Sequence, residues 1–134
     1  MVSKVKNVFF VFFLIFAIAP QAYVYAEGVV ENIEGFPLMP NFTEDDTRAL
    51  FFDKPDGRVI ESMLEGEANL QAAKEFYKES LGQIGWLLVD DTMAENLLRF
   101  EKEGETLSLQ FIELHNKLKI MVFLVPSNIE SSPV

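Results

Sequence analysis

The chain has 134 residues, of which 21 are acidic and 11 basic, and it contains no cysteine. Its formal net charge of −10 repels phosphate backbones and anionic lipid headgroups, which argues against nucleic-acid binding. The lack of cysteine excludes disulfides, thiol nucleophiles, thiolate zinc sites and a cysteine-linked lipid anchor. The length predicts one domain.

The first 26 residues have the three zones of a cleavable secretory signal peptide. Two lysines precede an unbroken apolar run over 8–19, Pro20 breaks any helix there, and Val24-Tyr25-Ala26 offers small residues at the two positions that signal peptidase reads. The alternative, an uncleaved membrane anchor, would need about 20 apolar residues. We therefore expect an exported chain that starts at Glu27, has no stable membrane span, and works in the periplasm or outside the cell.

The mature chain is predicted to open with an irregular segment and a β-hairpin. Residues 27–48 show no periodicity and are rich in glycine, proline and acid, so we expect an irregular N-terminal segment. It would pack as a leader strand or, alternatively, form an arm that grips a ligand or partner. Lys54-Pro55-Asp56-Gly57 is a turn signal because proline presets φ and glycine supplies a positive φ. The flanking runs 49–53 and 58–65 predict the two strands of the hairpin.

The next element is a predicted helix over 70–84. Asn69 is a suitable N-cap, and Gly85 can adopt the left-handed conformation that ends a helix. Since an isolated helix of this length is marginal in water, its apolar stripe must lie on a sheet. That stripe follows spacings of three and four and consists of Leu70, Ala73, Tyr77, Leu81 and Ile84.

The remainder of the domain reads as four strands. They are predicted at 86–90, 97–102, 106–114 and 117–125, and their connections are too short for parallel crossovers, so they form an antiparallel meander. The order ββαββββ defines a single α+β domain over 49–126 with one main helix on one face of the sheet. The last residues, 127–134, are expected to be a flexible polar tail.

Two of these strands, 86–90 and 117–125, have apolar residues on both faces. One face of the sheet would lie under the helix. The other would be covered by the N-terminal segment or by a partner. That second face is where we expect the function to lie.

Residues 76–86 spell a helix-to-strand junction, F-Y-x-x-x-L-x-x-x-G-W. Gly57-Arg58 follows the predicted hairpin turn, and Pro37-Leu38-Met39-Pro40 precedes the hairpin. Together these motifs resemble a group of small exported bacterial proteins of unknown function, over residues 37–126. The resemblance implies an envelope or periplasmic domain and carries over no catalytic or binding residue.

The sequence offers no catalytic constellation. His115, the only histidine, falls in a predicted turn, and no G-x-S-x-G motif supplies a serine for it to activate. Acid clusters at 44–46, 90–91 and 101–105 are candidates for Ca²⁺, which takes oxygen ligands, but we interpret them as solvated surface. We assign no catalytic residue, no metal site and no cofactor, and keep a hydrolase that uses carboxylates alone as a third hypothesis.

Two hypotheses for the function rank above the hydrolase. The first is a non-enzymatic module that binds a protein partner in the cell envelope. The alternative is a small carrier that holds an apolar ligand between helix and sheet. A carrier should have an internal cavity of a few hundred Å³. A docking domain should instead have a dense interior and an exposed apolar patch. For Trp86, core packing under the helix end is a further alternative. The candidate ligand or interface residues are Phe51, Tyr77, Trp86, Phe111 and Phe123, to which a carrier pocket would add Phe76 and Phe100.

Overall fold

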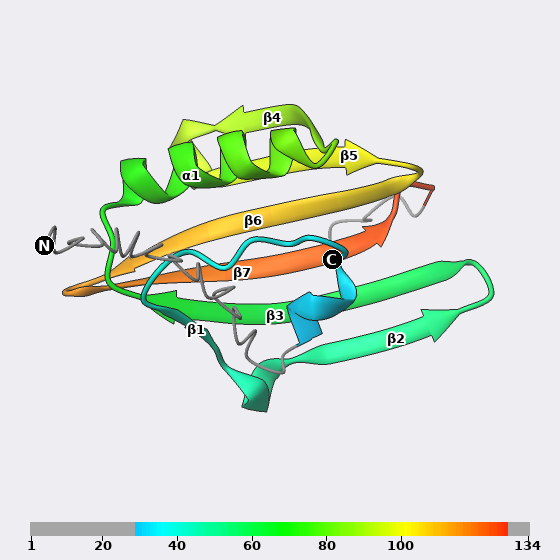
Figure 1. Ribbon diagram of the computed structural model, residues 1–134, viewed down its shortest axis with the longest axis horizontal. Helices are drawn as coiled ribbons and strands as arrows, with labels where there is room; N and C mark the ends of the chain where they lie inside the picture. The colour runs from blue at the N-terminus through cyan, green and yellow to red at the C-terminus, as the bar shows by residue number, and fades with distance from the viewer. Residues whose placement is uncertain (1–28, 129–134) are drawn as a thin grey trace, which may run out of the picture.

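The computed structural model describes residues 29–128, so the predicted signal peptide and residues 129–134 of the predicted tail lie outside it. Within this part, one α-helix, α1 (Leu70–Gln83), packs on one face of a seven-stranded antiparallel sheet (Figure 1). This confirms the predicted α+β class. No helix in the described range is long and apolar enough to cross a membrane.

The sheet has the order β1-β3-β7-β6-β5-β4, and β2 also pairs with β3. Strands β1 and β2 therefore follow one another along the same edge of β3. All pairs are antiparallel, and the central strands β3, β7 and β6 are the longest, with ten residues each. The bounds are β1 (Phe42–Glu44), β2 (Leu50–Lys54), β3 (Gly57–Gly66), β4 (Leu87–Thr92), β5 (Leu97–Lys102), β6 (Glu105–Leu114) and β7 (Lys117–Pro126).

The predicted elements differ from these mainly at the N-terminus. Strand β1 and two 3-10 turns, η1 (Val29–Asn32) and η2 (Asp46–Arg48), lie within the segment expected to be irregular. Three residues are too short for a periodic signal, and β1 exists because β3 offers it an edge. A third 3-10 turn, η3 (Met93–Glu95), connects β4 to β5.

Helix α1 begins and ends as its sequence predicts. The Asn69 side chain accepts hydrogen bonds from the backbone N–H groups of Gln71 (2.9 Å) and Ala72 (3.3 Å). At the other end Gly85 has φ +96°, and Lys102 Nζ donates to the Ile84 carbonyl at 2.8 Å, which suits the negative end of the helix dipole. The middle of the predicted apolar stripe is fully buried against the sheet, namely Ala73, Tyr77 and Leu81.

The N-terminal segment lies on the same face of the sheet as α1. Val30, Ile33 and Phe36 belong to the main hydrophobic core, and the Phe36 ring is 5.6 Å from that of Tyr77. Figure 1 shows the segment running beside α1 across β3 and β7. The expectation that this segment covers the second face of the sheet is therefore wrong: it completes the cover of the first.

One lysine of α1 is buried. Lys74 is only 4% exposed, and its Nζ lies 2.9 Å from Asp91 Oδ1 of β4. Lys78 Nζ reaches the other oxygen of the same carboxylate at 2.5 Å. These two hydrogen bonds, first that of Lys78 and then that of Lys74, lower the pKa of Asp91. The Asp91 carboxylate thus fastens the outermost strand of the meander to α1.

Candidate functional site

The side of the sheet that faces away from α1, which we call the open sheet face, carries no α-helix among residues 29–128. Successive side chains on a strand point to opposite faces, so the register identifies its members. In one row across β3, β7, β6 and β5, Glu61 pairs with Phe123, Phe123 with Ser108, and Ser108 with Arg99. The apolar members of this face are Leu50, Phe52, Val59, Met63, Leu87, Leu97, Ile112, Leu114, Met121, Phe123 and Val125.

The open sheet face is electrically neutral although the chain is not. The same register places four basic and four acidic side chains on it. Among residues 29–128, the other five bases and fifteen acids lie off this face, so the whole excess of ten acids in that range is off it. The charged members are Lys54, Arg99, Lys117, Lys119, Glu61, Glu65, Asp90 and Glu101.

A shallow groove of about 350 Å³ crosses the middle of this face. It is lined by Ser108 and Gln110 of β6 and by Phe123 of β7, which is 39% exposed. Glu61 and Arg99 also line it, from the two flanking strands. Arg99 is held only by a long ion pair of 3.5 Å with Asp90, and Glu61 makes no ion pair with any residue from 29 to 128. The groove is therefore apolar in its walls and bordered by opposite charges.

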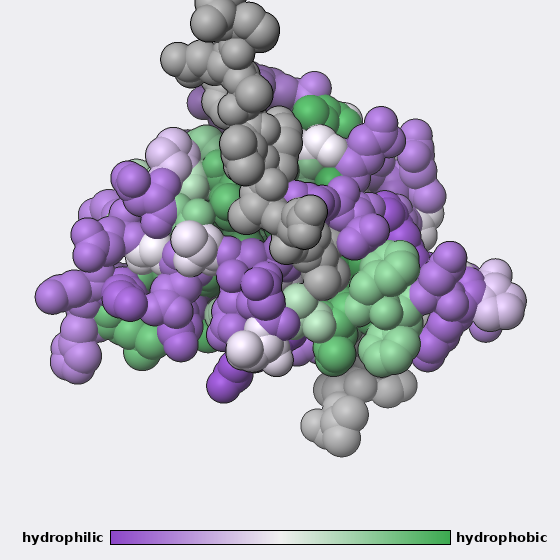
Figure 2. Space-filling view, turned by 60° about the horizontal axis from the view of Figure 1, so that its bottom comes forward, coloured by the Kyte–Doolittle hydropathy of each residue, from purple (hydrophilic) through white to green (hydrophobic). Residues whose placement is uncertain are grey.

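Both edge strands of the sheet carry exposed apolar residues. On β2 these are Leu50, Phe51 and Phe52, and on β4 they include Leu87, which is 67% exposed. Figure 2 turns the β2 edge toward the viewer and shows hydrophobic surface between hydrophilic side chains. Soluble proteins commonly protect sheet edges with charged residues or proline. The exposed apolar residues on β2 and β4 instead continue the apolar surface of the open sheet face to the edges of the sheet.

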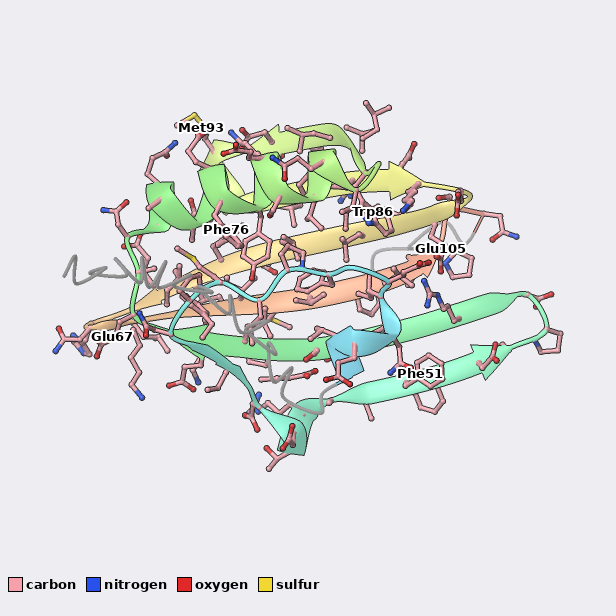
Figure 3. The ribbon with its side chains drawn as sticks, in the orientation of Figure 1. Phe51, Glu67, Phe76, Trp86, Met93 and Glu105 are labelled. Carbon is pink, nitrogen blue, oxygen red and sulfur yellow. The ribbon has the colours of Figure 1, made fainter. Side chains whose placement is uncertain are left out.

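The structure brings three of the five predicted site residues together, in the core, and separates the other two. Tyr77 and Phe111 are core residues with ring centroids 6.4 Å apart. Trp86 is 5% exposed and packs in the core at the end of α1. Phe51 lies on β2, far from Trp86 (Figure 3), and on the side of the sheet that bears α1, whereas Phe123 is on the open sheet face.

A very small hollow of about 50 Å³ lies near Trp86, between the N-terminal segment and the turn after β5. Arg58 and Glu105 form a bidentate pair beside it, at 2.8 and 2.9 Å, and Arg58 also donates to the Asn32 carbonyl. Lys102 Nζ lies 5.9 Å from the centroid of the Trp86 ring. The Trp86 indole N–H is buried and has no protein partner in the described part. The volume suits a bound water better than a substrate.

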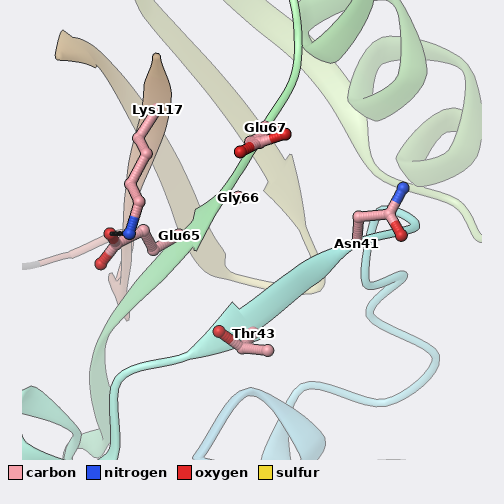
Figure 4. A pocket seen from close by; sticks show the side chains of 6 residues that line it. All are labelled: Asn41, Thr43, Glu65, Gly66, Glu67 and Lys117. Carbon is pink, nitrogen blue, oxygen red and sulfur yellow. Dashed lines mark hydrogen bonds and ion pairs between the residues drawn. The ribbon is translucent and has the colours of Figure 1, made fainter. Parts of the chain in front are cut away.

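A polar hollow of about 550 Å³ lies where β1 meets the end of β3 (Figure 4). Its charged groups already pair with each other, since Lys117 Nζ lies 2.9 Å from Glu65 Oε1, which lowers the pKa of Glu65. Gly66 is required here because a Cβ would lie 2.6 Å from the Phe42 ring. No buried, unpaired polar side chain points to a ligand, so this hollow is not a prepared site.

The structure offers little acid–base or metal chemistry. His115 is exposed in a turn, and burial raises the pKa of Tyr77, so that its hydroxyl cannot serve as a base. The Met39 backbone opposes that rise only in part, and the buried hydroxyl has no hydrogen-bond partner in the described part of the chain. Among residues 29–128, no three His, Cys, Asp or Glu side chains are grouped to hold a metal.

Sequence reasoning missed the residues that define the open sheet face. No local sequence feature links Arg99 with Glu61, and none marks Ser108 or Met121 as functional. The only signal was the apolar character of 117–125 on both faces, because which residues share a row depends on strand register. Arg58 and Arg99 each pair with a carboxylate, that of Glu105 and that of Asp90.

Comparison of the chain with models of protein families, with curated proteins and with solved structures gave no match. The functional argument therefore rests on the open sheet face itself.

Proposed function

We propose that the protein is an exported, non-enzymatic binding module of the cell envelope, and that it binds a protein through its open sheet face. The observation that supports this best is the contrast in charge: the face is neutral and rich in apolar side chains, while the rest of the chain holds the entire acidic excess. The acidic remainder keeps the chain soluble. The neutral face is free of that repulsion and can be buried.

The dimensions of the face suit a protein partner. The sheet is six strands wide, because β1 and β2 pair with the same edge of β3. Strands spaced about 4.8 Å apart and about eight residues long, at about 3.4 Å per residue, present a surface of roughly 29 by 27 Å. This is close to the roughly 800 Å² per partner that a stable protein interface buries. Aromatic and methionine side chains such as Phe123 and Met121 are typical of the centres of such interfaces.

The carrier hypothesis receives no comparable support. Side chains that would line a ligand cavity between α1 and the sheet, such as Tyr77, Phe100 and Leu109, are fully buried against their neighbours. The hollows described above all lie at the surface. A dense interior with an exposed apolar face is the arrangement expected of a docking domain.

A photo-crosslinking amino acid placed at Gln110 tests this function in the cell that makes the protein. Gln110 is exposed and lines the groove, so the probe should crosslink the chain to a protein, either a second copy or another envelope protein. Glu79, exposed on the outer side of α1, is the matched control and should give little product. Equal crosslinking at the two positions, or none at Gln110, would contradict the proposal.

A further inference from the structure

We infer that the occupant of the open sheet face is a second copy of this chain, bound face to face about a two-fold axis that runs parallel to the strands between β6 and β7. The inference rests on the proposed function, because it takes the open sheet face to be a protein-binding surface. It is carried by the arrangement of charge, shape and apolar residues in the rows of the sheet.

The charges of the central row are self-complementary about this axis. In the row Glu61–Phe123–Ser108–Arg99, the axis passes between Phe123 and Ser108. A two-fold rotation about it places Glu61 of one copy opposite Arg99 of the other, and does so twice. Both residues then lie about 7 Å from the axis, one and a half strand spacings. The roughly 30° angle between aligned packed sheets shifts them by about 4 Å, within reach of a flexible arginine.

Other central axes do not give this match. A two-fold axis along the row, perpendicular to the strands, would place Glu61 on Glu61 and Arg99 on Arg99. An axis parallel to the strands but along β7 would place Glu61 opposite Ser108 and leave Arg99 without an acid. Like charges facing each other across an interface cost several kcal/mol, so the axis between β6 and β7 is the one that the charges favour.

The same axis fits a protruding side chain to a hollow. Phe123 of β7 is 39% exposed, and it lines the groove together with the smaller Ser108 of β6. The rotation places Phe123 of each copy over Ser108 of the other. Two phenyl rings then fill the middle of the interface, where large aromatic side chains contribute most to binding.

The apolar margins also meet. In the next row, Met63–Met121–Gln110–Leu97, Met63 is already buried within its own chain, and Met121 comes opposite Gln110 of the second copy. On the other side of the central row, Phe52 of β2 comes opposite Leu87 of β4, which joins the two exposed edge residues. Charge neutrality favours the same occupant, because two copies of the exported chain, each with 9 basic and 21 acidic residues (9 − 21 = −12), can approach closely only through a face that holds none of the excess.

Exchanging the charges of Glu61 and Arg99 in the purified, exported protein tests the inference. Sedimentation equilibrium should give twice the chain mass at micromolar concentration. Glu61→Arg, which sets the introduced arginine of each copy against Arg99 of the other, should raise the dimer dissociation constant at least about tenfold. Adding Arg99→Glu restores opposite charges and should return it to within about threefold of the wild type. Glu79→Arg makes the same change of net charge on α1 and should have no comparable effect.

Each other outcome counts against the inference. A wild-type chain that is still monomeric when concentrated about 100-fold further would overturn self-association, since the dissociation constant would then lie far above that of a stable interface of this size. So would a folded Glu61→Arg/Arg99→Glu variant that stays as weak as the single variant, because it would exclude this axis. In either case, crosslinks from Gln110 to a different envelope protein would leave the proposed function standing, whereas the absence of all crosslinks would remove both.

Discussion

At the scale of single residues, the Asp91 carboxylate is the polar contact that matters most for the fold. It accepts from buried Lys74 and from Lys78, and so joins β4 to α1. We expect Asp91→Asn to lower the free energy of unfolding by about 2 kcal/mol at neutral pH, because it leaves a buried ammonium without its charged partner. Glu79→Gln, on the exposed side of the same helix, should change it by less than about 0.5 kcal/mol.

The effect of Asp91 should depend on pH in one direction. Its pKa is lowered below the usual 3.8 by hydrogen bonds from Lys78 and Lys74. A carboxyl group with a lowered folded pKa stabilises the fold above its unfolded pKa and loses that contribution as the pH falls through the folded value. Urea titrations of wild type and Asp91→Asn should therefore differ by a constant amount between about pH 5 and 8 and converge below about pH 4. A difference that grows on acidification would contradict this assignment.

At the scale of elements, the N-terminal segment is part of the core and not an arm. Phe36 is 6% exposed and packs on Tyr77, so Phe36→Ala should cost about 3 kcal/mol. Phe51→Ala makes the same truncation on an edge strand where the ring is 43% exposed, and it should cost less than about 1 kcal/mol. Chemical denaturation of both variants decides the matter, and equal losses would show that the segment does not pack as described.

The elements that sequence reasoning predicted are those that carry their own local signals. Asn69, the stripe through Tyr77 and the turn around Pro55 fix α1 and the β2–β3 hairpin without reference to the rest of the chain. Strand β1 and the burial of Lys74 depend on neighbours distant in sequence, namely β3 and Asp91. No window of the sequence contains both partners of such a contact.

The candidate site follows the same division. Alternation within 117–125 shows that both faces of that strand are apolar, which points to a second buried or docked face. It does not show that Glu61 and Arg99 lie in one row, because that requires the registers of three strand pairs. Single aromatic residues such as Tyr77 and Trp86 attracted attention in the sequence, yet they pack in the core.

At the scale of the whole molecule, the chain separates two kinds of surface. Helix α1 and the N-terminal segment cover one face of the sheet, and the acidic excess lies away from the other. This separation leaves one neutral surface with apolar side chains available for contact, while the acidic excess lies elsewhere. The proposed binding function depends on that asymmetry between the two faces.

The natural methionines report on the asymmetry most directly. Met121 lies on the open sheet face, Met39 packs against the core on the other side of the sheet, and Met93 is exposed in η3. In methyl spectra of ¹³C-methionine-labelled protein recorded from dilute to concentrated solution, the Met121 signal should shift as the open sheet face becomes covered, while those of Met39 and Met93 stay in place. A constant Met121 signal, or a shift confined to Met39 or Met93, would contradict the account.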